Sequence, residues 1–147
     1  EHVRDLVETN LVGLYALTQL VGRRMLAQGG GVVVNIASPS ATASLDRYGL
    51  AGYAATKAAV VALTRELAAQ WGGRGVRVNA LAPCFFPGAT TGWLQDPDQV
   101  AWISAHTPLG RPPRPEELDG PLLFLAGDAS SYVTGQTLYV DGGWTCY

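Results

Sequence analysis

Two short runs of β-branched and apolar residues, separated by a long helix-forming segment, constrain the fold of this chain most strongly. The runs cover 32–36 and 76–81, and the alanine-rich segment over 51–71 ends at a pair of glycines. Strands that are joined through a helix usually pair in parallel. The pattern therefore predicts an α/β fold with helices on the faces of a parallel sheet.

The remaining sequence continues this alternation of helix and strand signals. Apolar residues recur at helical spacing over 2–28 and are followed by glycines, so we expect one long helix there. The other elements that the pattern predicts are a loop, two helices and a strand, which cover 37–50, 96–105, 115–125 and 137–140, respectively.

Composition argues against several classes of function. The chain has 147 residues, 48% hydrophobic and 15% charged, so we expect one domain with a sizeable core. A net charge of −2 without an arginine cluster predicts no nucleic-acid partner. No apolar run reaches the roughly 20 residues of a membrane span, and no signal peptide is recognisable, so we expect a cytoplasmic protein without membrane contact. Cys84 and Cys146 lie far apart without histidines at ligand spacing, which predicts no metal site.

The segment YAATK places a hydroxyl and an ammonium group on one face of the helix over 51–71. Tyr53 and Lys57 are four residues apart, which is about one helical turn. This spacing alone favours an ordinary helix surface, because both residue types are common there. The surrounding sequence must decide between that interpretation and a catalytic pair.

Five blocks of sequence resemble the C-terminal half of the short-chain dehydrogenase/reductase family, in the same order. They read VVVNIAS, YAATKAAVVALTRELA, GVRVNALAP, PLGRPPRPEEL and FLAGDASSYVTGQTLYVDGG. The resemblance extends over nearly the whole chain. It implies a partial Rossmann-like fold, a doubly wound parallel sheet in three layers that lacks its N-terminal half. It also implies that 1–147 form the C-terminal catalytic portion of a single dehydrogenase domain.

The same resemblance implies a catalytic role for Tyr53 and Lys57. Hydride transfer between a carbinol carbon and nicotinamide needs a group that moves a proton at the substrate oxygen. A phenol is a poor base at neutral pH, but a nearby ammonium favours its phenolate form. Tyr53 is thus expected to be the general acid–base, and Lys57 to support it while binding the nicotinamide ribose. By resemblance, Ser38 would hold the substrate oxygen and Asn10 would support a proton-relay water.

Alternatives remain open around these residues. Ser38 is also placed to cap its loop, and because the loop is slightly longer than the family usually has, Ser40 is a second candidate for the substrate-facing position. Asn10 is compatible with a structural amide that bends its helix. Tyr48 is expected to form a wall of the substrate pocket, and Arg47 to meet an acidic substrate.

The segment over 82–95 is where the family closes over the nicotinamide. Pro83, Phe85 and Phe86 are expected to contact the cofactor, although two loop aromatics are as often ordinary core residues. The hydroxyl residue that meets the cofactor phosphate in the family is absent from its usual place. Thr90 or Thr91 is expected to substitute for it.

Two departures from the family pattern affect cofactor binding. Cys84 replaces a glycine, which predicts strain if the position requires a positive φ, and its thiol is interpreted as buried and inert. The glycine-rich turn that follows the first strand in the family is also missing, since the glycines 29–31 precede a strand. We therefore expect a missing N-terminal segment, with NAD or NADP bound weakly or not at all by this chain alone.

The expected substrate is a small-molecule alcohol or ketone. The ending VDGGWT and the loop APCFFP are most similar to branches that act on sugar acids and polyols, such as the gluconate 5-dehydrogenases, with 3-oxoacyl-carrier-protein as the alternative substrate. A truncated, non-catalytic remnant that acts as an interaction or assembly module is the alternative to an enzyme. Helices 2–28 and 51–71 resemble those that pair between family subunits, so a homo-oligomer, either dimer or tetramer, is expected.

Overall fold

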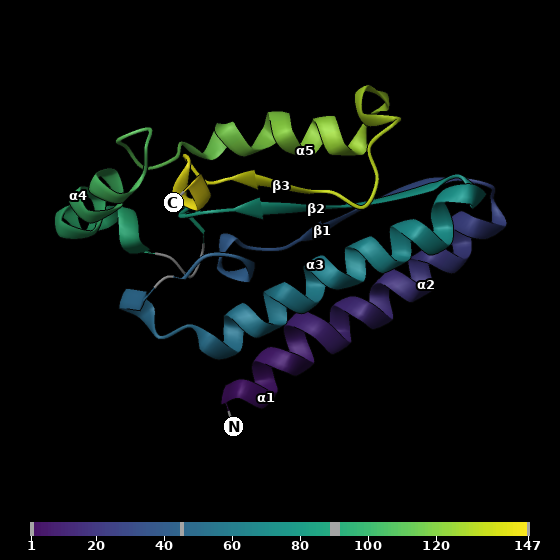
Figure 1. Ribbon diagram of the computed structural model, residues 1–147, viewed down its shortest axis with the longest axis horizontal. Helices are drawn as coiled ribbons and strands as arrows, with labels where there is room; N and C mark the ends of the chain where they lie inside the picture. The colour runs from purple at the N-terminus through teal and green to yellow at the C-terminus, as the bar shows by residue number, and fades with distance from the viewer. Residues whose placement is uncertain (1, 45, 89–91, 147) are drawn as a thin grey trace.

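The computed structural model describes residues 2–44, 46–88 and 92–146. Its centre is a sheet of three parallel strands in the order β1-β2-β3, with helices on both faces (Figure 1). The strands are β1 (Gly31–Ile36), β2 (Val76–Pro83) and β3 (Thr137–Val140). The predicted parallel α/β fold in three layers is confirmed.

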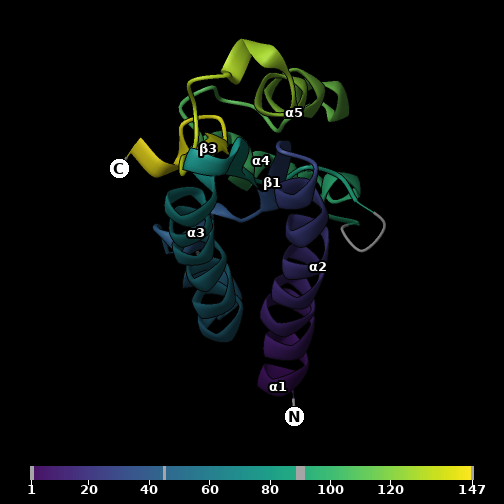
Figure 2. The same cartoon turned by 90° about the vertical axis from the view of Figure 1, so that its right-hand side faces the viewer.

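The helices divide between the two faces of the sheet. α1 (His2–Val7), α2 (Leu14–Ala27) and α3 (Ala51–Trp71) lie on one face, and α5 (Asp119–Ala126) lies on the other, as Figure 2 shows. α4 (Pro97–His106) lies beyond the carboxyl ends of the strands (Figure 1).

The core forms where β2 packs against α3. The apolar residues of β2 that are 0% exposed are Val76, Val78, Ala80, Leu81 and Ala82. This continuous burial is typical of a central parallel strand covered on both faces. On α3, Val60, Leu67 and Trp71 are buried against it. α2 approaches Trp71 closely because residue 22 is glycine, and a Cβ atom there would collide with the indole ring.

The structure refines three of the predicted elements. Glu8–Gly13 form a π-helical turn between α1 and α2, so the long N-terminal helix is not regular throughout. The predicted helix over 115–125 begins with a 3₁₀ turn, Pro115–Leu118, before α5. The predicted loop over 37–50 contains two 3₁₀ turns, Pro39–Ala41 and Asp46–Tyr48.

The edge of the sheet at β1 is much less covered than the central strand β2. Among the described strands, β1 pairs only with β2, and Ile36 at its end is 45% exposed. On the adjoining α2, Leu17 and Leu20 are 62% and 64% exposed. None of the helices in the described part of the chain has the length and apolarity needed to cross a membrane.

Candidate active site

Tyr53 and Lys57 occupy the first two turns of α3, beside the carboxyl end of β1. The Lys57 Nζ atom lies 5.6 Å from the centre of the Tyr53 ring. It donates a hydrogen bond of 2.9 Å to the carbonyl oxygen of Ile36, the last residue of β1. Burial lowers the pKa of the ammonium group of Lys57, and Lys57 is the only lysine in the sequence. The structure thus places Tyr53 and Lys57 at the carboxyl end of the sheet, where ligands bind in open parallel sheets.

Ser38 and Ser40 follow β1 and are hydrogen-bonded to each other. The Ser38 hydroxyl accepts a hydrogen bond from the Ser40 backbone N–H and donates one to the Ser40 hydroxyl, both at 3.2 Å. Ser38 therefore caps the turn Pro39–Ala41, which packs against α3. Ser40 lines an open cavity of about 500 Å³ that also reaches the first turn of α3. The two serines are hydrogen-bonded neighbours, and which of them faces a substrate stays a prediction.

Asn10 lies in the π-helical turn and is tied to the helix of Tyr53 through Thr56. The Asn10 side-chain amide donates a hydrogen bond of 3.2 Å to the Thr56 hydroxyl, which donates one of 2.7 Å to the Tyr53 carbonyl oxygen. Thr56 is 2% exposed. Sequence reasoning did not single out Thr56, although its place between Tyr53 and Lys57 was a usable signal. π-helical turns occur frequently at functional sites, so the turn around Asn10 is compatible with the functional role predicted for this residue.

Tyr48 and Arg47 pack against α4. The Tyr48 hydroxyl donates a hydrogen bond of 2.8 Å to the Gln99 side chain, and the Tyr48 ring meets the Trp102 ring edge-on at 5.8 Å. The guanidinium of Arg47 lies 5.2 Å from the centre of the Trp102 ring. Sequence reasoning named Tyr48 and Arg47 but missed Trp102, because nothing in the local pattern links residues so far apart.

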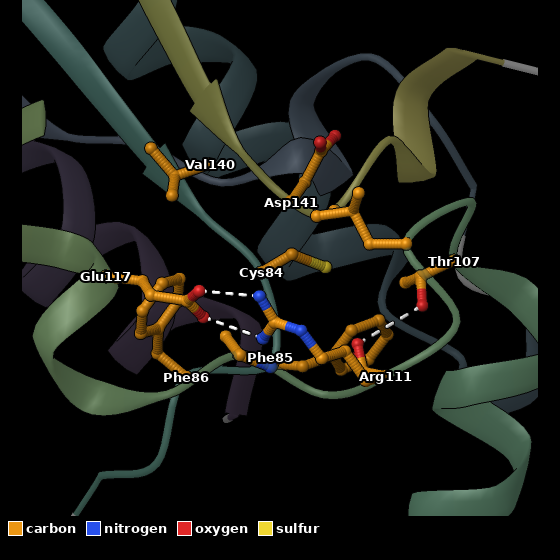
Figure 3. Close-up of a pocket in the computed structure, with 11 residues that line it drawn as sticks. Cys84, Phe85, Phe86, Thr107, Arg111, Glu117, Val140 and Asp141 are labelled. Atoms are coloured by element: carbon orange, nitrogen blue, oxygen red, sulfur yellow. Dashed lines mark hydrogen bonds and ion pairs between the residues drawn. The ribbon is translucent and has the colours of Figure 1, made fainter.

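The segment after β2 contributes to a second, narrower cavity, shown in Figure 3. Its volume is about 180 Å³, and Cys84, Phe86 and Val140 are among the residues that line it. Arg111 and Glu117 face each other across one wall through two hydrogen bonds, of 2.6 and 2.9 Å. The Arg111 guanidinium, with the Arg114 backbone N–H, lowers the pKa of Glu117 to about 2.

Cys84 and Phe85 differ in their backbone φ angles in a way that the sequence did not predict. The positive φ falls on Phe85, at 57°, and not on Cys84, so the condition under which strain was expected at the cysteine is not met. Burial, together with the Asp141 carboxylate, raises the pKa of the Cys84 thiol to about 12, in agreement with an inert thiol. Phe85 is buried with Ile103 and packs edge-on against Trp144 at 5.2 Å.

Phe85 is thus a core residue, and its contact with a cofactor stays a prediction, as do those of Pro83 at the end of β2 and of Phe86. Thr90 and Thr91 lie outside the described residues. Within the described part of the chain, no group of histidine, cysteine, aspartate and glutamate side chains is arranged to hold a metal ion.

Comparison with known proteins assigns the family. A family model described as enoyl-(acyl carrier protein) reductase matches residues 1–145. The galactitol 2-dehydrogenase (L-tagatose-forming) of Cereibacter sphaeroides is 42% identical over 98% of this chain and 57% of its own length. The chain belongs to the short-chain dehydrogenase/reductase family. The expected family and its Rossmann-like fold are therefore confirmed.

Other members of the short-chain dehydrogenase/reductase family agree with this assignment. The gluconate 5-dehydrogenase of Gluconobacter oxydans is 43% identical over 96% of this chain and 55% of its own length. A crystal structure of a gluconate 5-dehydrogenase from Burkholderia cenocepacia, in complex with NADP and tartrate, superposes with a TM-score of 0.92 at 39% identity. That match covers 99% of this chain and 57% of the crystallised one. This short-chain dehydrogenase/reductase chain thus spans little more than half the length of the relatives it matches.

Proposed function

We propose that this chain supplies the proton-transfer part of an NAD(P)-dependent oxidoreductase that interconverts a secondary alcohol and a ketone. The observation that carries the proposal is the placement of the Lys57 ammonium between the Tyr53 ring and the Ile36 carbonyl oxygen. In the described part of the chain, no residue forms a hydrogen bond with the Tyr53 hydroxyl, which leaves it available to a substrate oxygen.

The residues of this chain take defined parts in the proposed reaction. In the oxidative direction, the substrate hydroxyl gives its proton to the Tyr53 oxygen while its carbon loses a hydride; the reductive direction reverses both transfers. The bound nicotinamide supplies or accepts that hydride. Lys57 stabilises the Tyr53 phenolate by its charge and has further N–H groups with which to hold a ribose hydroxyl. The Ser38 and Ser40 hydroxyls orient the substrate oxygen.

Polyols and sugar acids are the proposed substrates. Support comes from the relatives named as galactitol 2-dehydrogenase and gluconate 5-dehydrogenase. The description of the matching family model, together with a relative named as a 3-oxoacyl-[acyl-carrier-protein] reductase, favours acyl-carrier-protein thioesters as the second candidate. Assays of gluconate and galactitol oxidation beside 3-oxoacyl-thioester reduction separate the two substrate classes.

Tyr53→Phe tests the proposal in the protein that carries these residues together with a dinucleotide-binding part. Removal of the acid–base hydroxyl is expected to lower turnover by about 10²- to 10⁴-fold, with nearly unchanged binding of NADH or NADPH in a fluorescence titration. Tyr15→Phe, at an exposed tyrosine of α2, is the matched control and is expected to keep full activity. Lys57→Ala is expected to weaken both turnover and cofactor binding.

Two results contradict the proposal. Unchanged turnover in Tyr53→Phe removes the acid–base assignment. If the unaltered protein binds neither NADH nor NADPH, the chain is better described as a non-catalytic remnant that acts in assembly, and the search turns to its partners.

A further inference from the structure

One face of α3 carries both the catalytic candidates and a buried polar residue. Tyr53, Lys57, Val60 and Thr64 are spaced by four, three and four residues, so they form a stripe along one side of the helix. Val60 and Thr64 are each 0% exposed, whereas Tyr53 and Lys57 are only partly buried. The stripe thus extends from the candidate site into the interior of the molecule.

Two hydrogen bonds join this stripe to β1 in the described part of the chain. Lys57 donates one of 2.9 Å to the Ile36 carbonyl oxygen, and the Thr64 hydroxyl accepts one, also of 2.9 Å, from the Asn35 side-chain amide. Asn35 and Ile36 are consecutive in β1, while Lys57 and Thr64 lie seven residues apart on α3, which is about two helical turns. The bond from Asn35 is therefore a second attachment of the same stripe to the same strand.

The Asn35–Thr64 pair is enclosed between β1 and α3. Asn35 is 4% exposed. The Thr64 hydroxyl donates a hydrogen bond of 2.8 Å to the Val60 carbonyl oxygen, so its oxygen is left to accept from Asn35. Asparagine is uncommon in strands, and burying an amide costs free energy that an apolar side chain of similar shape avoids. Packing alone therefore does not account for a polar pair at this place.

A hydrogen bond fixes the position of two elements more narrowly than apolar contact does. Apolar burial has no direction, whereas an amide and a hydroxyl must meet within a narrow range of distance and angle. The bond from Asn35 to Thr64 thus fixes how far α3 is displaced along β1. That displacement decides whether the Lys57 ammonium meets the Ile36 carbonyl oxygen, and where Tyr53 stands relative to the serines that follow β1.

We propose that Asn35 and Thr64 are positioning residues, whose hydrogen bond sets the register of α3 along β1 and thereby the place of Lys57 and Tyr53. The inference rests on the proposed function, in which Lys57 supports proton transfer at Tyr53. The pair acts through these two residues and not by contact with a substrate. A displacement of about 1 Å in a reacting group can lower turnover about 100-fold, so a bond that fixes register affects the rate from a distance.

The test compares single and double variants in the protein that carries these residues together with a dinucleotide-binding part. Thr64→Val keeps the shape but removes the hydroxyl, and is expected to lower kcat about 10- to 100-fold with KM nearly unchanged. Thr64→Ser keeps the hydroxyl and is expected to keep most of the turnover. Asn35→Leu combined with Thr64→Val removes both polar partners, so it should regain the stability that Thr64→Val loses, while kcat stays low.

The double variant separates positioning from a purely structural role. Thermal unfolding establishes that each variant is folded and measures its stability. If turnover recovers together with stability in the double variant, the pair only stabilises the fold and the inference is overturned. Unchanged kcat in Thr64→Val would overturn it as well.

Ser130→Ala is the matched control for lost stability. Ser130 is 0% exposed, and its hydroxyl donates hydrogen bonds to the Leu125 and Gly127 carbonyl oxygens at the end of α5, on the other face of the sheet. Removal of this hydroxyl is expected to lower the midpoint of thermal unfolding without lowering kcat. If Ser130→Ala lowers kcat as much as Thr64→Val does, turnover follows stability alone and the inference fails.

A measurement on Lys57 decides the inference even if the unaltered protein shows no turnover, an outcome that counts against the proposed function alone. Labelling lysine with ¹³C at the ε carbon gives an NMR signal for Lys57, identified by its absence in Lys57→Met. This signal is expected to shift in Thr64→Val and in the double variant, and to return in Thr64→Ser. An unshifted signal in either of the first two variants would show that the place of Lys57 does not depend on the pair.

Discussion

The region around the central strand β2 and the region around the edge strand β1, called here the closed flank and the open flank, differ in burial. The closed flank, in which β2 packs against α3, is buried along nearly its whole length. The open flank, formed by β1 and the outward face of α2, leaves a groove of about 290 Å³ between Leu17, Val21 and the residues of β1. Both strands are short and apolar, so the difference arises from position in the sheet and not from composition.

This difference in burial indicates that the open flank is the surface on which further structure would pack. An unpaired strand edge and a contiguous apolar surface are where further strands, or another copy, pack most readily. The relatives are nearly twice as long as their matched portion. We therefore expect the open flank to face the part of such proteins that this chain does not match. The catalytic candidates lie between the flanks, since Lys57 comes from α3 of the closed flank and bonds to Ile36 of the open one.

The largest expected effect comes from paired truncations, one in each flank. Trp71→Ala in the closed flank removes a buried indole that fills the space beside Gly22, and should lower the free energy of unfolding by about 3–5 kcal/mol. Leu17→Ala in the open flank removes a side chain that is already 62% exposed, and should change it by no more than about 0.5 kcal/mol. Urea denaturation followed by circular dichroism measures both.

Repeating both measurements at several protein concentrations tests whether a second copy of the chain covers the open flank. If Leu17→Ala costs as much as Trp71→Ala, the open flank is covered in solution and the contrast between the flanks fails for the free chain. A cost that grows with protein concentration would identify a second copy of the chain as the cover, in line with the expected homo-oligomer.

A smaller effect is expected at the polar link between the N-terminal helices and α3. Thr56→Val keeps the shape of the side chain but removes the hydroxyl that binds Asn10 and the Tyr53 carbonyl, and should cost about 1–3 kcal/mol. Thr56→Ser keeps the hydroxyl and should cost less. A double-mutant cycle with Asn10→Ala measures the coupling, and strictly additive effects would mean that the two side chains do not stabilise each other.

Local sequence patterns predicted the helices, the strands and the Tyr53–Lys57 pair. They did not predict features that depend on contacts between segments far apart in the sequence. The helix over 51–71 was predicted with the bounds that the structure has, because alanine content and flanking glycines are local properties. The π-helical turn around Asn10 was not predicted, since its bonding pattern depends on packing against α3. Strain at Cys84 was predicted only if that position required a positive φ, but the positive φ lies at Phe85, whose ring packs against Trp102 and Trp144.

The smallest expected effect concerns the protonation of Lys57, where the two flanks meet. Because Lys57 is the only lysine, selective ¹³C labelling of its ε carbon gives a single NMR signal whose pH titration reports its pKa. Burial lowers this pKa in the folded chain, so the midpoint should lie below that of the urea-unfolded chain, which is expected near 10.5. A folded midpoint at or above the unfolded one would contradict the burial of this ammonium.

The same titration carries a consequence for stability and for the open flank. Between the two midpoints the unfolded chain binds more protons than the folded one, so the contribution of Lys57 to stability rises with pH across that window and is constant below it. Lys57→Met should lack this rise, and the comparison with the unaltered chain cancels the opposite trend above pH 9 from Cys84, whose pKa is raised from 9.0 to about 12. In a longer protein whose additional strands cover Ile36, Lys57 is more deeply buried and the folded midpoint should fall further. An unchanged midpoint would show that whatever covers the open flank does not reach the catalytic pair.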